Sequence, residues 1–157
     1  MLGVLHIICA LLGLCIGAFV FLRPKGSRLH RIAGYTYVAC LLFVNISALS
    51  IYDQSVDGGP FHVLAVFSLS TLVAALATVI LRAPNPGWLN LHAHFMGWSY
   101  VGVISAGVGQ LLGMLNIQPA LLSVGVPSAL AVIFGGLIVH LKVPAAISAL
   151  KLPGKTT

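Results

Sequence analysis

Long apolar runs, separated by short polar or turn-forming stretches, dominate this chain. Each of five runs reaches the roughly 20 residues that an α-helix needs to cross a bilayer. Their unbroken apolar character differs from the alternating pattern of membrane β-strands, which are about ten residues long. We therefore predict an all-α, polytopic membrane helix bundle with five transmembrane helices, forming a single transmembrane domain over residues 1–157. The predicted helices are 2–22, 32–51, 61–81, 88–115 and 120–141, and a short tail, 142–157, follows them.

The stretches between the runs have the composition of turns. Asp57-Gly58-Gly59-Pro60 separates the second run from the third, and two prolines within 83–87 separate the third from the fourth. Pro127 falls inside the fifth run, where it predicts a kink. The first run has no basic segment before it, so we expect a retained helix rather than a cleaved secretory signal.

Charged residues are scarce. Lys and Arg total 8 and Asp and Glu total 2, or 6% of the 157 residues, whereas a soluble domain carries about 25%. The mean hydropathy is +1.08. So few charges cannot cover a soluble domain of this size, which excludes an ordinary cytosolic enzyme and a disordered chain. The basic residues are dispersed between apolar runs, so the pI of about 9.7 does not indicate nucleic-acid binding. The expected partner is the lipid bilayer.

The basic residues follow alternate runs along the chain. They lie after the first run, after the third run and in the tail, whereas the connections after the second and fourth runs have none. The positive-inside rule then predicts an N-terminus outside and a C-terminus inside. The basic residues are Arg23, Lys25, Arg28, Arg31, Arg82, Lys142, Lys151 and Lys155.

Histidine is the main ionisable residue in and beside the spans. Such residues are costly in a membrane and usually face the bundle interior, and neutral imidazole is a ligand for metals and haem iron. The expected topology places His6 and His62 toward the outer side, and His30 and His92 toward the inner side. Roughly 15 Å or more should separate these levels, given a hydrocarbon core of about 30 Å. One metal ion therefore cannot take ligands from both levels.

Two further histidines have simpler interpretations. His94 lies two positions from His92, about 200° around a helix, so the two side chains cannot face the same site, and we expect His94 to be packed or interfacial. His140 is close to Lys142 and is expected at the head-group level. The three cysteines fall inside predicted spans and are expected to be small packing residues.

Small residues recur at helical spacing in several runs. In membranes such residues let helices approach closely, so we interpret them as packing positions without a chemical role. They include Gly13, Gly17, Gly102, Gly109, Gly113, Gly135 and Gly136.

Carboxylates are missing from the predicted spans. Asp53 and Asp57 both lie in the connection after the second run, and the chain has no HExxH pattern. A carboxylate proton relay, an acid–base hydrolase and a zinc peptidase therefore lack the residues they require. The sequence favours a protein that is not an enzyme.

Two strings carry a family resemblance: residues 30–38, HRIAGYTYV, and residues 92–100, HAHFMGWSY. Together they resemble a family of small multi-pass bacterial membrane proteins, domain of unknown function 2306 (DUF2306). That family has a His-Arg-x-x-Gly-x-x-Tyr string at one helix and a His-x-x-Trp-Met-x-Arg-Ser-Tyr string at a later one. The matching residues are His30, Arg31, Gly34, Tyr37, His92, Met96, Ser99 and Tyr100.

The chain departs from the second string at two positions. Phe95 stands where the family commonly has Trp, and Trp98 stands where it commonly has Arg. The loss of that charge disfavours an anion site at the inner mouth. The resemblance implies a protein of the bacterial cytoplasmic (inner) membrane, and it brings no reaction with it.

Polar residues follow both strings into the membrane. Tyr37 and Tyr100 lie about two turns deeper than His30 and His92, where their hydroxyl groups need partners. Met96 and Ser99 share a helix face with His92. We therefore predict a polar seam through the second and fourth helices.

Three hypotheses for the function remain open. In the first, b-type haem binds between histidines at matched depth, His30 with His92 and His6 with His62, and the protein exchanges electrons with a membrane redox partner. In the second, the chain is a small transporter, an accessory subunit or an assembly factor, with histidines as polar or proton-sensitive groups. A second copy of the chain, forming a homo-oligomer, is the alternative to a redox partner. In the third, a metal ion binds His30 and His92, with His140 as an additional candidate ligand.

Overall fold

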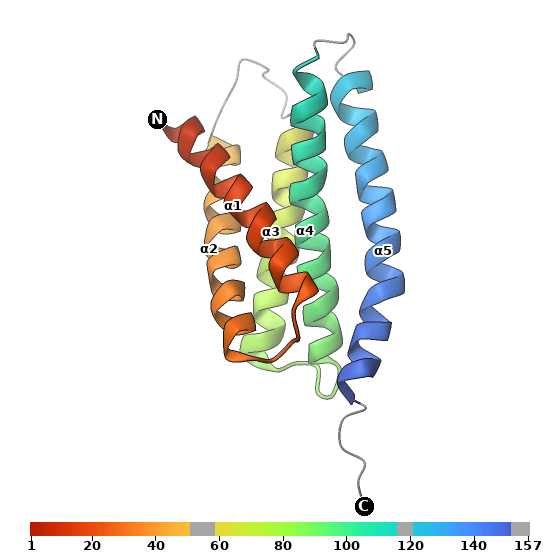
Figure 1. Ribbon diagram of the computed structural model, residues 1–157. Helices are drawn as coiled ribbons and strands as arrows, with labels where there is room; N and C mark the ends of the chain where they lie inside the picture. The colour runs from red at the N-terminus through yellow and green to blue at the C-terminus, as the bar shows by residue number, and fades with distance from the viewer. Residues whose placement is uncertain (51–58, 116–120, 152–157) are drawn as a thin grey trace, which may run out of the picture.

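The computed structural model describes residues 1–50, 59–115 and 121–151. These residues form five long α-helices that run alternately up and down (Figure 1). All five are long and apolar enough to cross a membrane, which confirms the predicted helical membrane architecture. A π-helical turn, η1 (Leu121–Gly125), precedes the fifth helix. The helices are α1 (Leu2–Leu22), α2 (Arg28–Ser50), α3 (Pro60–Leu81), α4 (Trp88–Gly113) and α5 (Val126–Lys151).

α2 begins four residues earlier than predicted because Ser27 caps it. The His30 N–H donates to Ser27 Oγ at 3.1 Å, and the Arg31 N–H donates to the Ser27 carbonyl at 3.2 Å. A serine side chain that accepts from the third residue of a helix satisfies one of its unpaired N–H groups. His30 therefore lies inside the first turn of α2.

α5 also differs from its predicted bounds. It begins at Val126 and continues to Lys151, so much of the predicted tail is helical. Pro127 is the second residue of α5, where a proline is tolerated, and it follows directly on the π-helical turn η1. Pro144 is the proline inside α5. α4 ends at Gly113, two residues early, and the turn residue Asp57 lies outside the described residues.

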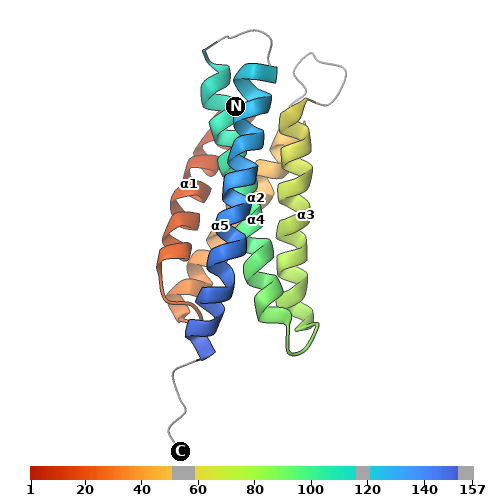
Figure 2. The ribbon, with the colours of Figure 1, turned by 90° about the vertical axis from the view of Figure 1, so that its right-hand side faces the viewer.

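The first four helices enclose one interior. α2 packs on α1 and α3, and α4 packs on α3 and α1, so α2 and α4 lie diagonally across the interior. α5 packs on α4 from outside this group, as Figure 2 shows with α5 in front of α4. The buried apolar residues of the interior are Tyr37, Leu41, Leu72, Ala75, Met96 and Val103.

The two ends of the bundle differ in charge. We call the lower end in Figure 1 the basic end: it contains the α1–α2 connection, residues 23–27, and the α3–α4 connection, residues 82–87. Lys25 folds back onto α1 there and donates to the carbonyls of Val20, at 2.6 Å, and Phe21, at 2.8 Å. These bonds satisfy carbonyls that the last helical turn leaves unpaired, and burial lowers the pKa of the Lys25 ammonium group.

Candidate functional site

A buried hydrogen bond joins α2 and α4 across the interior. The hydroxyl oxygens of Tyr37 and Ser99 lie 3.0 Å apart, and both side chains are almost fully buried. Ser99 Oγ donates its hydrogen to the Met96 carbonyl at 2.9 Å, so Tyr37 is the donor to Ser99. This contact lies where the predicted polar seam through the second and fourth helices should be.

Tyr100 attaches the same region to α1. Its hydroxyl donates to the Leu14 carbonyl at 3.0 Å, and its ring centroid lies 6.2 Å from that of Tyr37. The ring lies directly against Gly17, where a Cβ would meet Tyr100 Cδ2 at 2.6 Å. The missing side chain of Gly17 therefore lets an α4 tyrosine reach the α1 backbone.

The seam continues toward the opposite end of the bundle. Asn45 Nδ2 donates to Ser68 Oγ at 3.3 Å, and Ser68 Oγ donates to the Ser99 carbonyl at 3.4 Å. Nearer that end, His6 Nδ1 lies 2.7 Å from Ser47 Oγ. The sequence analysis did not single out Ser47 or Ser68. The feature that could have identified them is their position, because each is a polar residue on the buried face of an apolar helix.

Three serine hydroxyl groups of the seam donate to backbone carbonyls. Ser47, Ser68 and Ser99 each donate to a backbone carbonyl, so their hydrogens do not run head to tail from one side chain to the next. The bonds that join different helices are Tyr37 to Ser99, Asn45 to Ser68 and Ser68 to the Ser99 carbonyl. Interhelical bonds of this kind hold membrane helices together, each with a modest contribution of about 0.6 kcal/mol. The seam is thus best suited to fixing the relative positions of α2, α3 and α4.

His92 is held by α3. Its Nδ1 lies 3.1 Å from the Ala75 carbonyl oxygen, which also accepts from Thr78 Oγ1 at 2.7 Å. A carbonyl only accepts, so Nδ1 carries the hydrogen and Nε2 of the neutral ring keeps its lone pair. Histidines that bind metal commonly donate their second ring nitrogen in this way, which fixes the tautomer and the ring orientation.

His30 lies at the same end of the bundle, on the diagonally opposite helix. Its imidazole lies within electrostatic reach of the Lys25 ammonium group and of the His92 imidazole. The Nδ1 of His30 is buried and has no hydrogen-bond partner among the described residues. Buried polar atoms are nearly always paired, so this nitrogen is a candidate ligand atom.

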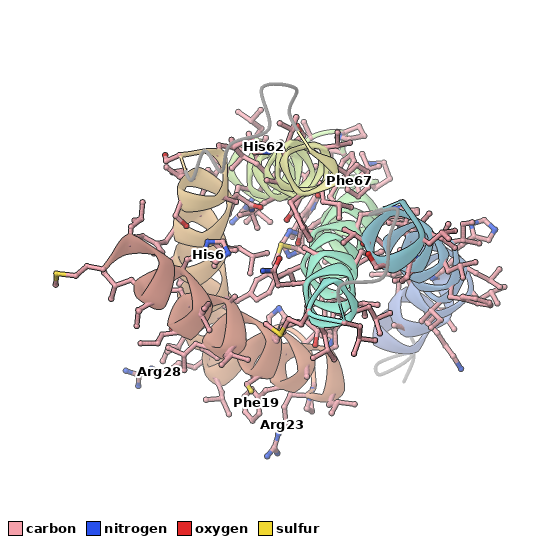
Figure 3. All side chains as sticks on the ribbon, turned by 90° about the horizontal axis from the view of Figure 1, so that it is seen from above. His6, Phe19, Arg23, Arg28, His62 and Phe67 are labelled. Atoms are coloured by element: carbon pink, nitrogen blue, oxygen red, sulfur yellow. The ribbon has the colours of Figure 1, made fainter. Side chains whose placement is uncertain are left out.

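His6 and His62 lie at the other end of the bundle. Figure 3 shows this end, with His6 on α1 and His62 on α3. His6 is bonded to Ser47 of α2. His62 lines a shallow depression on α3 with Val63, Val66 and Phe67. The described contacts therefore do not bring these two imidazoles together.

The remaining histidines lie apart from the other candidates. His94 Nδ1 lies 2.8 Å from the Asn90 carbonyl of its own helix, and His140 is exposed on α5. Among the described residues, no group of three or more His, Cys, Asp or Glu side chains is placed to hold a metal ion. The hypothesised metal site of His30, His92 and His140 is therefore not formed.

Trp98, which departs from the family string, has a packing role. Its ring meets the Phe67 ring of α3 edge-on, with centroids 5.8 Å apart. On its other side it lies against Gly136 of α5, where a Cβ would come within 3.0 Å of Trp98 Cζ2. An apolar ring therefore occupies the position where the family commonly has a charge.

The helices, their apolar surfaces and their buried interhelical bonds define a multi-pass α-helical membrane protein. Residues 3–147 match the sequence profile described as "Predicted membrane protein (DUF2306)", so the chain belongs to the DUF2306 family. The resemblance carried by the two strings is thereby confirmed. Searches of curated proteins and of solved structures gave no match.

Proposed function

We propose that this protein is a membrane electron carrier that binds b-type haem through His30 of α2 and His92 of α4. One observation carries the proposal. Two imidazoles lie at the same end of the bundle on diagonally opposite helices, within electrostatic reach of each other, and each has a nitrogen suited to ligation. Bound haem would supply an iron that gains and loses one electron.

The donor set fits this cofactor better than it fits a bare metal ion. Two neutral imidazoles are suitable axial ligands for haem iron, whose other ligands come from the macrocycle. A structural metal ion usually needs three or four protein ligands, and the described residues do not gather three. The roles of this chain's residues are then distinct: His30 and His92 bind, while the Ala75 carbonyl orients His92.

In the alternative, the protein is an accessory subunit, an assembly factor or a small transporter, and its histidines are polar structural groups. The seam supports this alternative, because its bonds between α2, α3 and α4 serve to position the helices. Under it, His30 and His92 need no cofactor.

Visible spectra distinguish these two functions. We expect the protein, purified in detergent from cells supplied with haem, to show a Soret band that shifts on reduction with dithionite. His92→Ala and His30→Ala should lose that band. The matched controls, His94→Ala and His140→Ala, should keep it, because these imidazoles lie outside the pair. A folded, colourless wild-type preparation would exclude the haem proposal.

A second haem at the opposite end, held by His6 and His62, extends the same proposal. Both residues lie at that end, on the diagonal helices α1 and α3. The ratio of haem to protein tests it. A ratio near two that falls to one in His6→Ala and in His62→Ala supports the second site, whereas a ratio of one that neither variant changes excludes it.

We also propose that the basic end faces the cytoplasm of a bacterial inner membrane. The support is the basic residues of both connections at this end and the positive-inside rule. A fluorescent reporter fused after Thr157 should be active in the cytoplasm, and alkaline phosphatase fused there should be inactive. Fusions after Leu115 should show the reverse pattern. The opposite result at both positions would invert the proposed orientation.

A further inference from the structure

One face of α2 changes from closed to open along its length. His30, Gly34 and Leu41 lie within about 40° of one another around the helix axis, at about 100° per residue, so they share a face. Leu41 is 0% exposed and nearby Tyr37 is 1% exposed, so this face is closed in the middle of the bundle. Gly34 lies one turn from His30, toward the middle of the bundle, and is half-buried.

The space beside Gly34 is empty of protein atoms. A Cβ built on Gly34 would have no heavy atom within 4 Å. The packing glycines of α1 are different, since a Cβ on Gly13 would lie 2.9 Å from Leu41 Cδ1 and one on Gly17 would overlap the Tyr100 ring. Helix packing therefore does not explain the glycine at position 34. Helix propensity does not explain it either, because glycine is less favourable than alanine inside a helix.

The open space at Gly34 lies one helical turn from His30, whose Nδ1 has no hydrogen-bond partner among the described residues. Gly34 is four residues after His30, so the two positions are neighbours on the helix surface. A residue without a side chain lets a flat molecule approach the helix backbone closely. The side of α2 next to His30 thus combines a ligand atom with a surface free of protein side chains.

We propose that Gly34 is a binding-site residue, at which the edge of a planar macrocycle ligated by His30 packs directly on the α2 backbone. This inference rests on the proposed haem-binding function and specifies the shape of the ligand. A side chain at position 34 would occupy the place of the macrocycle while both histidines remain in the protein.

Substitution of Gly34 tests this inference with two independent readouts. Protein prepared from haem-starved cells is titrated with hemin, and its thermal unfolding without haem is recorded in the same detergent. We expect Gly34→Leu to weaken hemin binding at least tenfold and Gly34→Ala to weaken it less. Without haem, Gly34→Ala should melt at or above the wild-type temperature, because its Cβ meets no protein atom.

Gly107→Leu is the matched control. Gly107 lies on α4, is exposed, and would place its Cβ no closer than 4.0 Å to Leu14 Cδ1. It should bind hemin as the wild type does. If Gly34→Leu also binds hemin like the wild type, the role of Gly34 is wrong while haem binding stands. If Gly34→Ala destabilises the haem-free protein, the position serves packing. A wild type that binds no hemin overturns both proposals.

Discussion

Gly17→Leu should destabilise the folded bundle by about 3 kcal/mol, at the upper end of the range for overpacking a filled interior. A Cβ at this position would lie 2.6 Å from Tyr100 Cδ2 and 2.9 Å from Tyr37 Cε2. The rings cannot retreat freely, because the Tyr100 hydroxyl is bonded to Leu14 and the Tyr37 hydroxyl to Ser99. The longer side chain must therefore push α1 away from α4 or break these bonds. Unfolding in detergent, followed by circular dichroism, measures the loss.

Gly3→Leu provides the matched control for this prediction. Gly3 lies on the same helix, and a Cβ there meets no atom within 4 Å, so we expect a change within about 0.5 kcal/mol. A double-mutant cycle isolates the clash: Gly17→Ala should be less destabilising in a Tyr100→Ala background than alone. Equal effects in the two backgrounds would show that Tyr100 does not limit the space at Gly17.

Gly136→Leu should loosen α5 from the rest of the bundle and move the Trp98 ring toward lipid. A Cβ on Gly136 would come within 3.0 Å of both Trp98 Cζ2 and Cζ3, while Phe67 contacts the indole from α3. We expect a loss of about 2 kcal/mol. In a Trp88→Phe background, Trp98 is the sole tryptophan, so quenching of its fluorescence by brominated lipid should rise.

Ala129→Leu controls for the added volume on α5. Ala129 is exposed, so its substitution should change neither stability nor quenching appreciably. Because α5 packs on α4 and η1 outside the group of α1 to α4, Gly136→Leu should leave hemin binding at the proposed site largely intact. Loss of hemin binding in a stably folded Gly136→Leu protein would show that α5 helps to form the site.

The helices themselves could be predicted from the sequence, because a bilayer requires long apolar segments whose backbone bonds are satisfied internally. Their ends were less certain. The start of α2 depends on the Ser27 cap, and the extension of α5 past Lys142 has no hydropathy signal as strong as that of its apolar start. Trp98 was noticed as a departure from the family string, yet its contacts with α3 and α5 could not be inferred from spacing.

The candidate site could likewise be predicted from the sequence only in part. Residue type and depth were enough to select His30 and His92, since histidine is the main ionisable residue within the apolar spans. The Ala75 carbonyl as the partner of His92 was not accessible, because a backbone acceptor has no sequence signature. Gly34 is part of the family string in the sequence, but only the atoms around it show that, unlike Gly17, it has open space beside it.

By itself the sequence determined that the chain is a five-helix membrane protein, that its basic residues gather at one end, and that histidines are its main ionisable groups in the spans. These properties depend on local composition and on distance along the chain, because the thickness of the bilayer sets the length of a spanning helix and the depth of each residue in it. Only the tertiary structure decided which faces meet: α2 opposite α4, His92 against Ala75, and His30 beside an open stretch of helix. Those facts depend on close packing between helices, which residue spacing on one helix does not specify.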